Sequence, residues 1–336
     1  MLMPLGVLGF AALAPRSGLP SLVDPQGGLV MLAATCVLFY QWVNALGQGL
    51  LQGVGGFVRP SQGLLWLTLL ITACAVPLIW HMGLVGAYGV LMLNSVLPPV
   101  LLLGMYLRPE GAPGANARQA DEPLSLSLLT RMHAGSWPSV LGACVGAGVT
   151  WLCLVFLVNR AHGADGLGWV SLGVQWGTLM LLPVSSWGGV TMKRLIDALD
   201  SRDTAALSAT VRRQLLQNAL TTAVLAGLIV VVSPWIAALY KLPAAGMGTL
   251  MAVTAGYAVL GAMNNVYERL FFCLNRQGWW MVLTVMSAGV QSGVTAVLIE
   301  RSYLGVAMGL GAGALCLLLT SMWLHSRWQS AEAVAR

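Results

Sequence analysis

Apolar residues occur along this chain in long runs that are separated by short polar connections. The ten runs are Leu2–Leu13, Gly28–Leu51, Leu64–Trp80, Gly83–Leu107, Trp137–Val158, Gly168–Val190, Asn218–Tyr240, Thr249–Phe272, Trp279–Ile299 and Tyr303–Leu324. A helix that crosses a bilayer needs roughly 20 residues, and most of the runs reach that length, although the first is shorter. The pattern therefore predicts an all-α polytopic membrane protein with about ten transmembrane helices.

The composition supports this fold class and removes several alternatives. Of the 336 residues, 57% are apolar and 8% are charged, whereas a soluble domain carries about a quarter charged residues. The net charge of +6 does not indicate nucleic-acid binding, because the basic residues lie mostly in connections between the apolar runs. The six cysteines form no CxxC pair and the four histidines are scattered. We therefore expect no disulfide, no metal site and no cofactor.

The basic residues are distributed unequally between alternate connections. Thirteen of the 17 lysines and arginines fall in one set of connections. The other set contains Arg16, Arg160, Lys241 and Arg301. Because short loops rich in Lys and Arg stay on the cytoplasmic side, we expect a multi-pass membrane protein with both termini in the cytoplasm.

The connection from Arg108 to Pro123 is rich in Pro, Gly, Ala and charge, which is typical of a linker. We therefore predict an N-terminal lobe of four helices at 1–107, a cytoplasmic linker at 108–136, a C-terminal lobe of six helices at 137–325 and a cytoplasmic tail at 326–336. The connection from Met192 to Gln214 has helical propensity, and we expect it to lie along the membrane surface.

The region from Asn44 to Leu107 is similar in pattern to the region from Asn264 to Leu324. Each begins with an asparagine in a polar-striped helix, reaches a basic turn and continues through an apolar helix to a short outer turn. This similarity predicts two related lobes arranged as a parallel repeat. Two further runs precede the second copy but not the first, so we expect the first lobe to lack its opening two helices.

Short motifs in the second lobe carry a resemblance to a known family. They are the Trp-Pro pair at Trp137 and Pro138, the Gln-Trp pair at Gln175 and Trp176, and the Leu-Leu-Pro turn that ends at Pro183. In these motifs the chain resembles the polysaccharide-export flippases, which are the O-antigen (Wzx-type) members of the MATE-like multidrug/oligosaccharidyl-lipid/polysaccharide (MOP) exporter superfamily.

The resemblance implies a fold, a function, partners and a location in the bacterial inner membrane. Such proteins have twelve helices in two six-helix lobes around a central cavity. They move undecaprenyl-diphosphate-linked oligosaccharide units from the cytoplasmic to the periplasmic leaflet by alternating access, in the biosynthesis of lipopolysaccharide and other polysaccharides. The expected partners are the lipid-linked oligosaccharide and the bilayer, with polysaccharide polymerase or assembly proteins as further candidates. The chain departs from the family pattern where the first two helices should be.

Polar side chains recur at helical spacing inside several apolar runs. The longest stripe has four amides at positions i, i+3, i+7 and i+11, which are Gln41, Asn44, Gln48 and Gln52. The other candidates of this kind are Ser171, Gln175, Asn218, Asn264, Asn265 and Glu268. Polar groups that face lipid are costly, so two interpretations stay open. The side chains line a hydrated cavity that passes sugar hydroxyls, or they form hydrogen bonds between helices.

Basic residues at the predicted cytoplasmic ends could draw in the diphosphate, since guanidinium groups donate paired hydrogen bonds to phosphate. The candidates are Arg59, Arg212, Arg213, Arg269 and Arg276. For Arg269 an ion pair with Glu268 is an equal alternative.

Pro98, Pro99 and Pro183 lie within apolar runs and are hinge candidates, because proline removes a helical hydrogen bond.

Other functions compete with the flippase. The first is an ion-coupled multidrug exporter of the same superfamily, which typically uses a buried acid in the first lobe. The first four runs contain no Asp or Glu. The second is a truncated homologue that does not transport. We do not expect an enzyme, because the outer connections are short and no nucleophile–base pair is present.

Overall fold

The computed structural model describes short helical pieces between residues 62 and 150, and then residues 153–201, 203–240 and 242–334. The chain divides into two compact units, Met1–Asp121 and Glu122–Arg336. The boundary falls inside the linker predicted at 108–136. In the first unit the described residues are helical, and Ile71, Pro98 and Leu102 are buried. The candidate site residues Gln41, Asn44, Gln48, Gln52, Arg59 and Pro99 lie outside the described residues.

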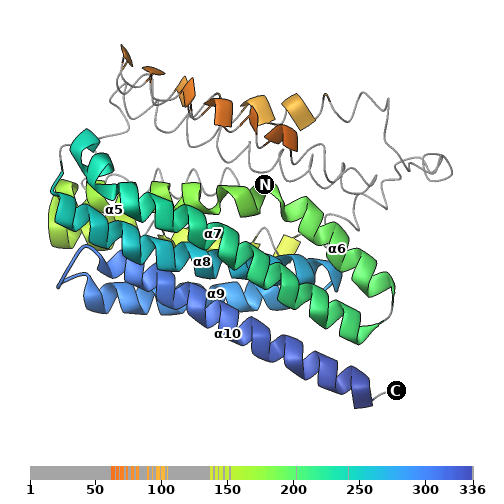
Figure 1. Cartoon of the computed structure of the whole chain (residues 1–336). Coiled ribbons are helices and arrows are strands. Elements are labelled where there is room, and N and C mark those ends of the chain that lie inside the picture. Colours follow the sequence, from red (N-terminus) through yellow and green to blue (C-terminus); the bar gives the residue numbers. More distant parts are fainter. Residues whose placement is uncertain are drawn as a thin grey trace. The chain divides into compact units, whose positions relative to one another are not determined.

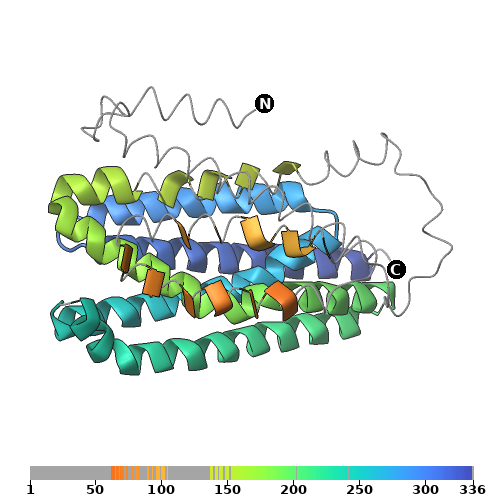
Figure 2. The same ribbon diagram turned by 90° about the horizontal axis from the view of Figure 1, so that it is seen from above.

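The second unit is built from helices alone over the residues that the structure describes. They are the π-helix η3 (Cys153–Val158) and the α-helices α5 (Asn159–Ser186), α6 (Gly188–Asp200), α7 (Thr204–Tyr240), α8 (Ala244–Cys273), α9 (Gln277–Leu298) and α10 (Gly305–Val334). Figure 1 shows α7 to α10 as long helices running side by side, and Figure 2 shows the same arrangement from above. The helix α8 contacts α5, α6, α7, α9 and α10, and it therefore lies at the centre of the unit.

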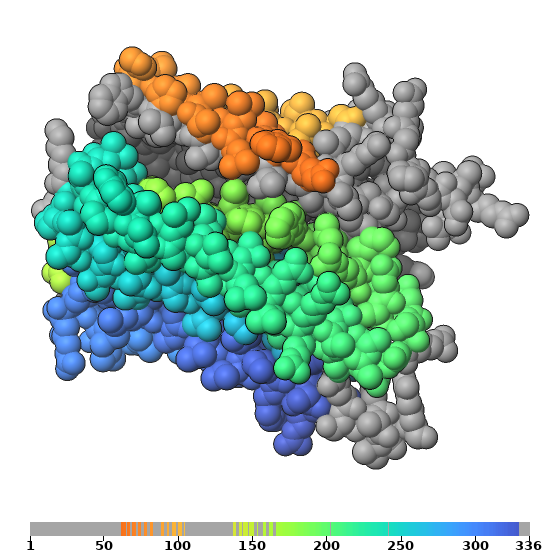
Figure 3. All heavy atoms as spheres, viewed as in Figure 1, coloured from red at the N-terminus to blue at the C-terminus, as the bar shows by residue number. Residues whose placement is uncertain are grey.

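Five helices of this unit are long and apolar enough to cross a membrane. The spans are Gly166–Ser186, Thr204–Tyr240, Ala244–Cys273, Gln277–Leu298 and Gly305–Trp328. Large apolar side chains on these helices are exposed, and among them are Leu220, Val224 and Trp235 of α7. Exposed apolar surface of this extent requires a hydrocarbon environment, so the chain is a multi-pass membrane protein. Figure 3 shows α7 running across the visible face of the unit.

The turn before the span at Gly166–Ser186 depends on one glycine. Gly163 has φ 63° and ψ −161°, a conformation that is rarely accessible to residues with a Cβ. The chain reverses here in a single tight turn, although the sequence pattern predicts a longer connection between Val158 and Gly168. At its other end α5 stops at Ser186, and α6 begins at Gly188. The predicted run to Val190 therefore crosses a helix boundary.

The connection predicted from Met192 to Gln214 is helical, as expected, but it consists of two helices. They are α6 and the first turns of α7, joined by a turn in which the Asp203 carboxylate accepts a hydrogen bond from the Ala205 amide at 2.8 Å. This bond satisfies one of the free amides at the start of α7. Hydropathy marks where a helix enters hydrocarbon rather than where it begins, so α7 starts well before the predicted Asn218. In the same way α10 continues past Leu324 to Val334.

Two clusters of buried side chains hold the unit together. One contains side chains from each of the helices α6 to α10 and includes Leu195, Phe271 and Trp280. The other joins α5, α7 and α8 through residues such as Met180 and Met251. These clusters fix the rotation of α5 and α7 against α8, and thereby decide which side chains of each helix point outward.

Candidate functional site: a polar face on α5 and the basic ends of the helices

The helix α5 places its glycines and its polar residues on different faces. Gly173 and Gly177 are buried against α8, where an added Cβ would lie 2.9 Å from Leu250 Cδ1 and 2.9 Å from Thr254 Cγ2 respectively. A side chain at either position would force a neighbouring α8 side chain to shift. This close approach turns the opposite side of α5, which carries Gln175 and Thr178, away from the packed interface.

The polar face of α5 is accessible. Gln175 and Thr178 are exposed, and Ser171 is half-buried one turn before them. The Thr178 hydroxyl donates to the carbonyl of Val174 at 3.0 Å within the helix. The Gln175 amide makes no hydrogen bond with a residue that the structure describes. Exposed amides within a membrane span need water or a polar ligand, so this face, defined by Ser171, Gln175 and Thr178, can exchange hydrogen bonds with a solute.

In α7 the polar side chains point inward instead. Asn218 is buried, and its Nδ2 donates to the carbonyl of Ala262 on α8 at 3.3 Å. Gln214 is buried as well, and its Oε1 accepts from the Thr191 hydroxyl at 3.2 Å. In this structure Asn218 thus makes the kind of interhelical hydrogen bond that the packing interpretation expects.

The predicted α8 residues contribute both bonded and unbonded polar atoms. Asn264 is buried, and its Nδ2 donates to the carbonyl of Ala314 on α10 at 2.8 Å. The Oδ1 atoms of Asn264 and Asn265 are buried without a hydrogen-bond partner. A buried acceptor without a partner costs about 1–3 kcal/mol. These two oxygens are therefore sites where a water or a ligand hydroxyl would be stabilising.

Arg269 packs at the junction between α5 and α6. Its Nη2 lies 2.9 Å from the position that a Cβ at Gly188 would occupy, and its Nε is buried without a partner. The ion pair considered for Glu268 and Arg269 is not formed, because Lys193–Asp197 is the one salt bridge among the described residues. The guanidinium of Arg269 is thus half-buried with unused donor capacity.

The other predicted basic residues occupy separate places. The guanidinium carbon of Arg276 lies 3.9 Å from the ring centroid of Trp328, a cation–π contact. Arg212 and Arg213 are exposed on α7. Arg213 lines a hollow between α6 and α7, whereas Arg276 lines another at the turn between α8 and α9.

The α9 helix carries a polar network whose residues are not among those predicted from the sequence. Gln291 is buried, and its Nε2 donates to the Thr150 hydroxyl at 3.0 Å. Ser287 donates to the carbonyl of Gly313 on α10 at 2.8 Å. Ser287, Gln291 and Thr295 recur at four-residue intervals, so the signal was present in the sequence. Among the described residues no group of three His, Cys, Asp or Glu side chains could hold a metal ion.

Comparisons with known proteins identify the architecture. No protein-family model matches the chain, and no curated protein matches it. An outward-facing multidrug resistance MATE family transporter of the MOP superfamily matches with a TM-score of 0.67 and 16% identity, over 99% of this chain and 76% of that one. The inward-facing conformation of such a transporter matches with a TM-score of 0.65 and 16% identity, over 100% and 79%. The chain has a MATE-like fold.

A third solved structure agrees with this result. It is a MOP superfamily transporter from Pyrococcus furiosus, described by the reverse polarity of its binding pocket, with a TM-score of 0.65 and 16% identity over 97% of this chain and 75% of that one. The predicted all-α, MATE-like fold is confirmed. The number of ten helices stays a prediction, and so does the flippase subfamily, because identities this low establish the MATE-like fold alone.

Proposed function

We propose that this protein is a flippase that moves lipid-linked oligosaccharide units across the membrane by alternating access through a polar cavity. The observation that carries the proposal is the exposed polar face of α5. In a lobe whose α7 exposes leucine, valine and tryptophan, the exposed Gln175 and Thr178 mark the side that contacts water rather than lipid.

The chemistry of this face suits sugars. A carboxamide donates and accepts hydrogen bonds, and a hydroxyl does both as well, so Ser171, Gln175 and Thr178 can exchange bonds with successive sugar hydroxyls without one deep pocket. The unpaired Oδ1 atoms of Asn264 and Asn265 add two acceptors in α8. The amides predicted in the first lobe would offer sugar hydroxyls hydrogen bonds of the same kind.

The diphosphate of the cargo would meet arginine first. Arg269 has a half-buried guanidinium with an unpartnered Nε, and it is the strongest candidate of the predicted mouth, to which Arg59, Arg212, Arg213 and Arg276 also belong. Because it packs against Gly188 at the start of α6, binding a phosphate there would also act on the α5–α6 junction.

A pair of cysteine variants tests the cavity. In a background without the native cysteines, Gln175→Cys should react with a membrane-impermeant thiol reagent, because its face contacts water. Val224→Cys is the matched control, since Val224 is 74% exposed on α7 but faces hydrocarbon. Equal protection of both positions from either side of the membrane would refute the cavity.

Transport itself is tested with reconstituted protein and a fluorescent lipid-linked oligosaccharide. Arg269→Ala should lower the flipping rate while the protein stays folded in detergent, whereas Arg301→Ala, a loss of the same charge in an exposed turn, should not. An unchanged rate in Arg269→Ala would remove this residue from the transport path.

An ion-coupled multidrug exporter is the second candidate. Glu268 is the single acid within the five described spans, and it is half-buried on α8, where an ion-coupled carrier could use it. Dye efflux that depends on sodium or protons and is lost in Glu268→Gln would favour this candidate. Flipping that persists in Glu268→Gln without an ion gradient would favour the flippase.

A further inference from the structure

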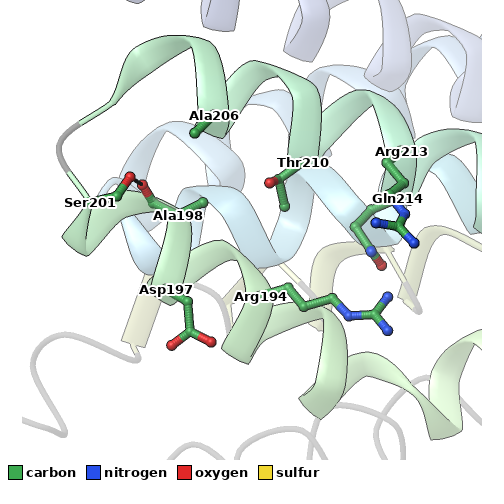
Figure 4. Close-up of a pocket in the computed structure, with 8 residues that line it drawn as sticks. All are labelled: Arg194, Asp197, Ala198, Ser201, Ala206, Thr210, Arg213 and Gln214. Atoms are coloured by element: carbon green, nitrogen blue, oxygen red, sulfur yellow. Dashed lines mark hydrogen bonds between the residues drawn. The ribbon is translucent and has the colours of Figure 1, made fainter.

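An open hollow of about 420 Å³ lies between the helices α6 and α7. Its lining comes from both helices and from the turn between them. The residues are Arg194, Asp197, Ala198, Ser201, Ala206, Thr210, Arg213 and Gln214. Figure 4 shows the side chains of Arg194 and Arg213 at the same end of the hollow, beside Gln214.

The two arginines retain most of their hydrogen-bonding capacity. Arg194 donates from Nη1 to Gln217 Oε1 at 3.2 Å, which uses one of the five N–H groups of a guanidinium. Arg213 is exposed and makes no hydrogen bond or ion pair with another described residue. The bond from Arg194 holds its guanidinium beside Gln217, which is one helical turn along α7 from Arg213, and both arginines line the same hollow.

The acid in the hollow is already paired. Both carboxylate oxygens of Asp197 accept hydrogen bonds from Lys193 Nζ at 3.1 Å. The pair is exposed and contributes little to stability, but it balances the negative charge that would oppose an anion. The net charge around the hollow from Lys193, Arg194, Asp197 and Arg213 is therefore positive.

The end of the hollow at Arg213 and Gln214 lies where α7 would leave the lipid headgroups. Residues 214–240 of α7 contain no charged side chain, and at 1.5 Å per residue they extend over about 40 Å. This matches the roughly 40–45 Å of a bilayer with its interfacial regions. Arg213 is the first charge beyond this stretch, while Leu216 and Leu220, 61% and 56% exposed, begin the face that contacts hydrocarbon.

We propose that this hollow binds the phosphodiester of an acidic bilayer phospholipid. Arg194 and Arg213 hold the phosphate oxygens, Thr210 and Gln214 complete the polar wall, and the acyl chains lie along Leu216 and Leu220. The lipid is a resident ligand that fixes the α6–α7 hairpin to the membrane surface. The proposal shares Arg213 with the predicted cytoplasmic mouth, but it concerns a resident bilayer lipid and not the cargo.

The test uses the full-length chain in a neutral detergent, with its melting temperature measured against added phosphatidylglycerol. Phosphatidylglycerol should raise the melting temperature more than phosphatidylcholine does. Each arginine near the headgroups contributes about a fivefold gain in affinity, so the double variant Arg194→Gln/Arg213→Gln should need about 25-fold more phosphatidylglycerol. An unchanged titration in the double variant would overturn the site.

Three further measurements sharpen this test. The double variant Arg301→Gln/Arg327→Gln loses the same net charge elsewhere and should titrate like the wild type. If it lost as much affinity for phosphatidylglycerol as the first double variant, the effect would be one of bulk charge and the proposal would be overturned.

Soluble glycerol 3-phosphate should stabilise the protein far less than phosphatidylglycerol, and equal stabilisation would exclude a lipid site. If the first double variant does not fold, Asp197→Asn should lower the required phosphatidylglycerol by about fivefold, and no change would overturn the site.

Discussion

The helices α5 and α7 contain polar residues at similar helical spacing, yet they present them in opposite directions. In α7 the side chains of Gln214, Asn218, Thr222 and Ser233 are buried. In α5 the polar Gln175 and Thr178 are exposed, and Leu172 and Met180 are buried. The α7 helix, with its polar side chains inside, has the polarity expected of a span whose outer face contacts lipid. The α5 helix, with polar side chains outside, has the polarity expected of a wall that contacts water.

This difference shows where the lobe can contact a solute. A polar side chain that faced lipid would leave water without compensation. Exposed polar side chains on α5 therefore indicate contact with water, whereas an exposed apolar side chain would not distinguish water from lipid. The comparison favours α5 over α7 as the helix that would face the solute in the proposed function. The α7 outer face, by contrast, serves as membrane contact.

An introduced charge should distinguish the two faces most strongly. Val224→Arg on the lipid face of α7 should cost about 2.5–3.5 kcal/mol of insertion free energy, whereas Gln175→Arg on α5 should cost much less because the guanidinium reaches water. The measurement is the yield of folded, monodisperse protein from membranes. Equal losses for both variants would mean that α5 also faces lipid.

A side chain added at the α5–α8 interface should act through packing. Gly177→Val places atoms within 2.9 Å of Thr254 Cγ2, and overpacking of this kind typically costs about 1–3 kcal/mol. Gly256→Val on α8 is the control, because a Cβ there meets nothing within 4 Å. The melting temperature should fall in the first variant, and thiol labelling of Gln175→Cys should change with it if the glycine sets the orientation of α5. If the first variant melted at the same temperature as the control, the glycines would not set this orientation.

Loss of an inward amide should have the smallest effect. Asn264→Leu removes the hydrogen bond to the Ala314 carbonyl, and interhelical bonds in membranes contribute about 0.6 kcal/mol on average. Because Asn264→Leu also removes the unpartnered buried Oδ1 atom, whose burial is itself unfavourable, we expect little change in melting temperature for Asn264→Leu and none for Gln175→Leu. If Asn264→Leu lowered the flipping rate strongly while its melting temperature stayed the same, Asn264 would line the transport path in another conformation.

The boundaries of the helices were only partly predictable. Hydropathy located the five described spans, since each is a long apolar run, but it missed the first turns of α7 and the last turns of α10. No glycine or proline interrupts α7 between Thr204 and Asn218, so its backbone stays helical where its side chains become charged. The predicted run Asn218–Tyr240 contains Pro234, and the structure keeps this proline inside α7, where it costs one hydrogen bond.

The sequence by itself determined that this is an all-α membrane protein, where its apolar spans lie and which polar residues recur at helical spacing, because these properties follow from local composition and the period of the helix. Only the tertiary structure decided which of those residues point inward and which outward. Hydrogen bonding between helices and contact with water both favour amides at one-turn intervals. The choice between them depends on the rotation of each helix, which Gly173 and Gly177 on α5 and the buried clusters around α8 fix by contacts far apart in the chain.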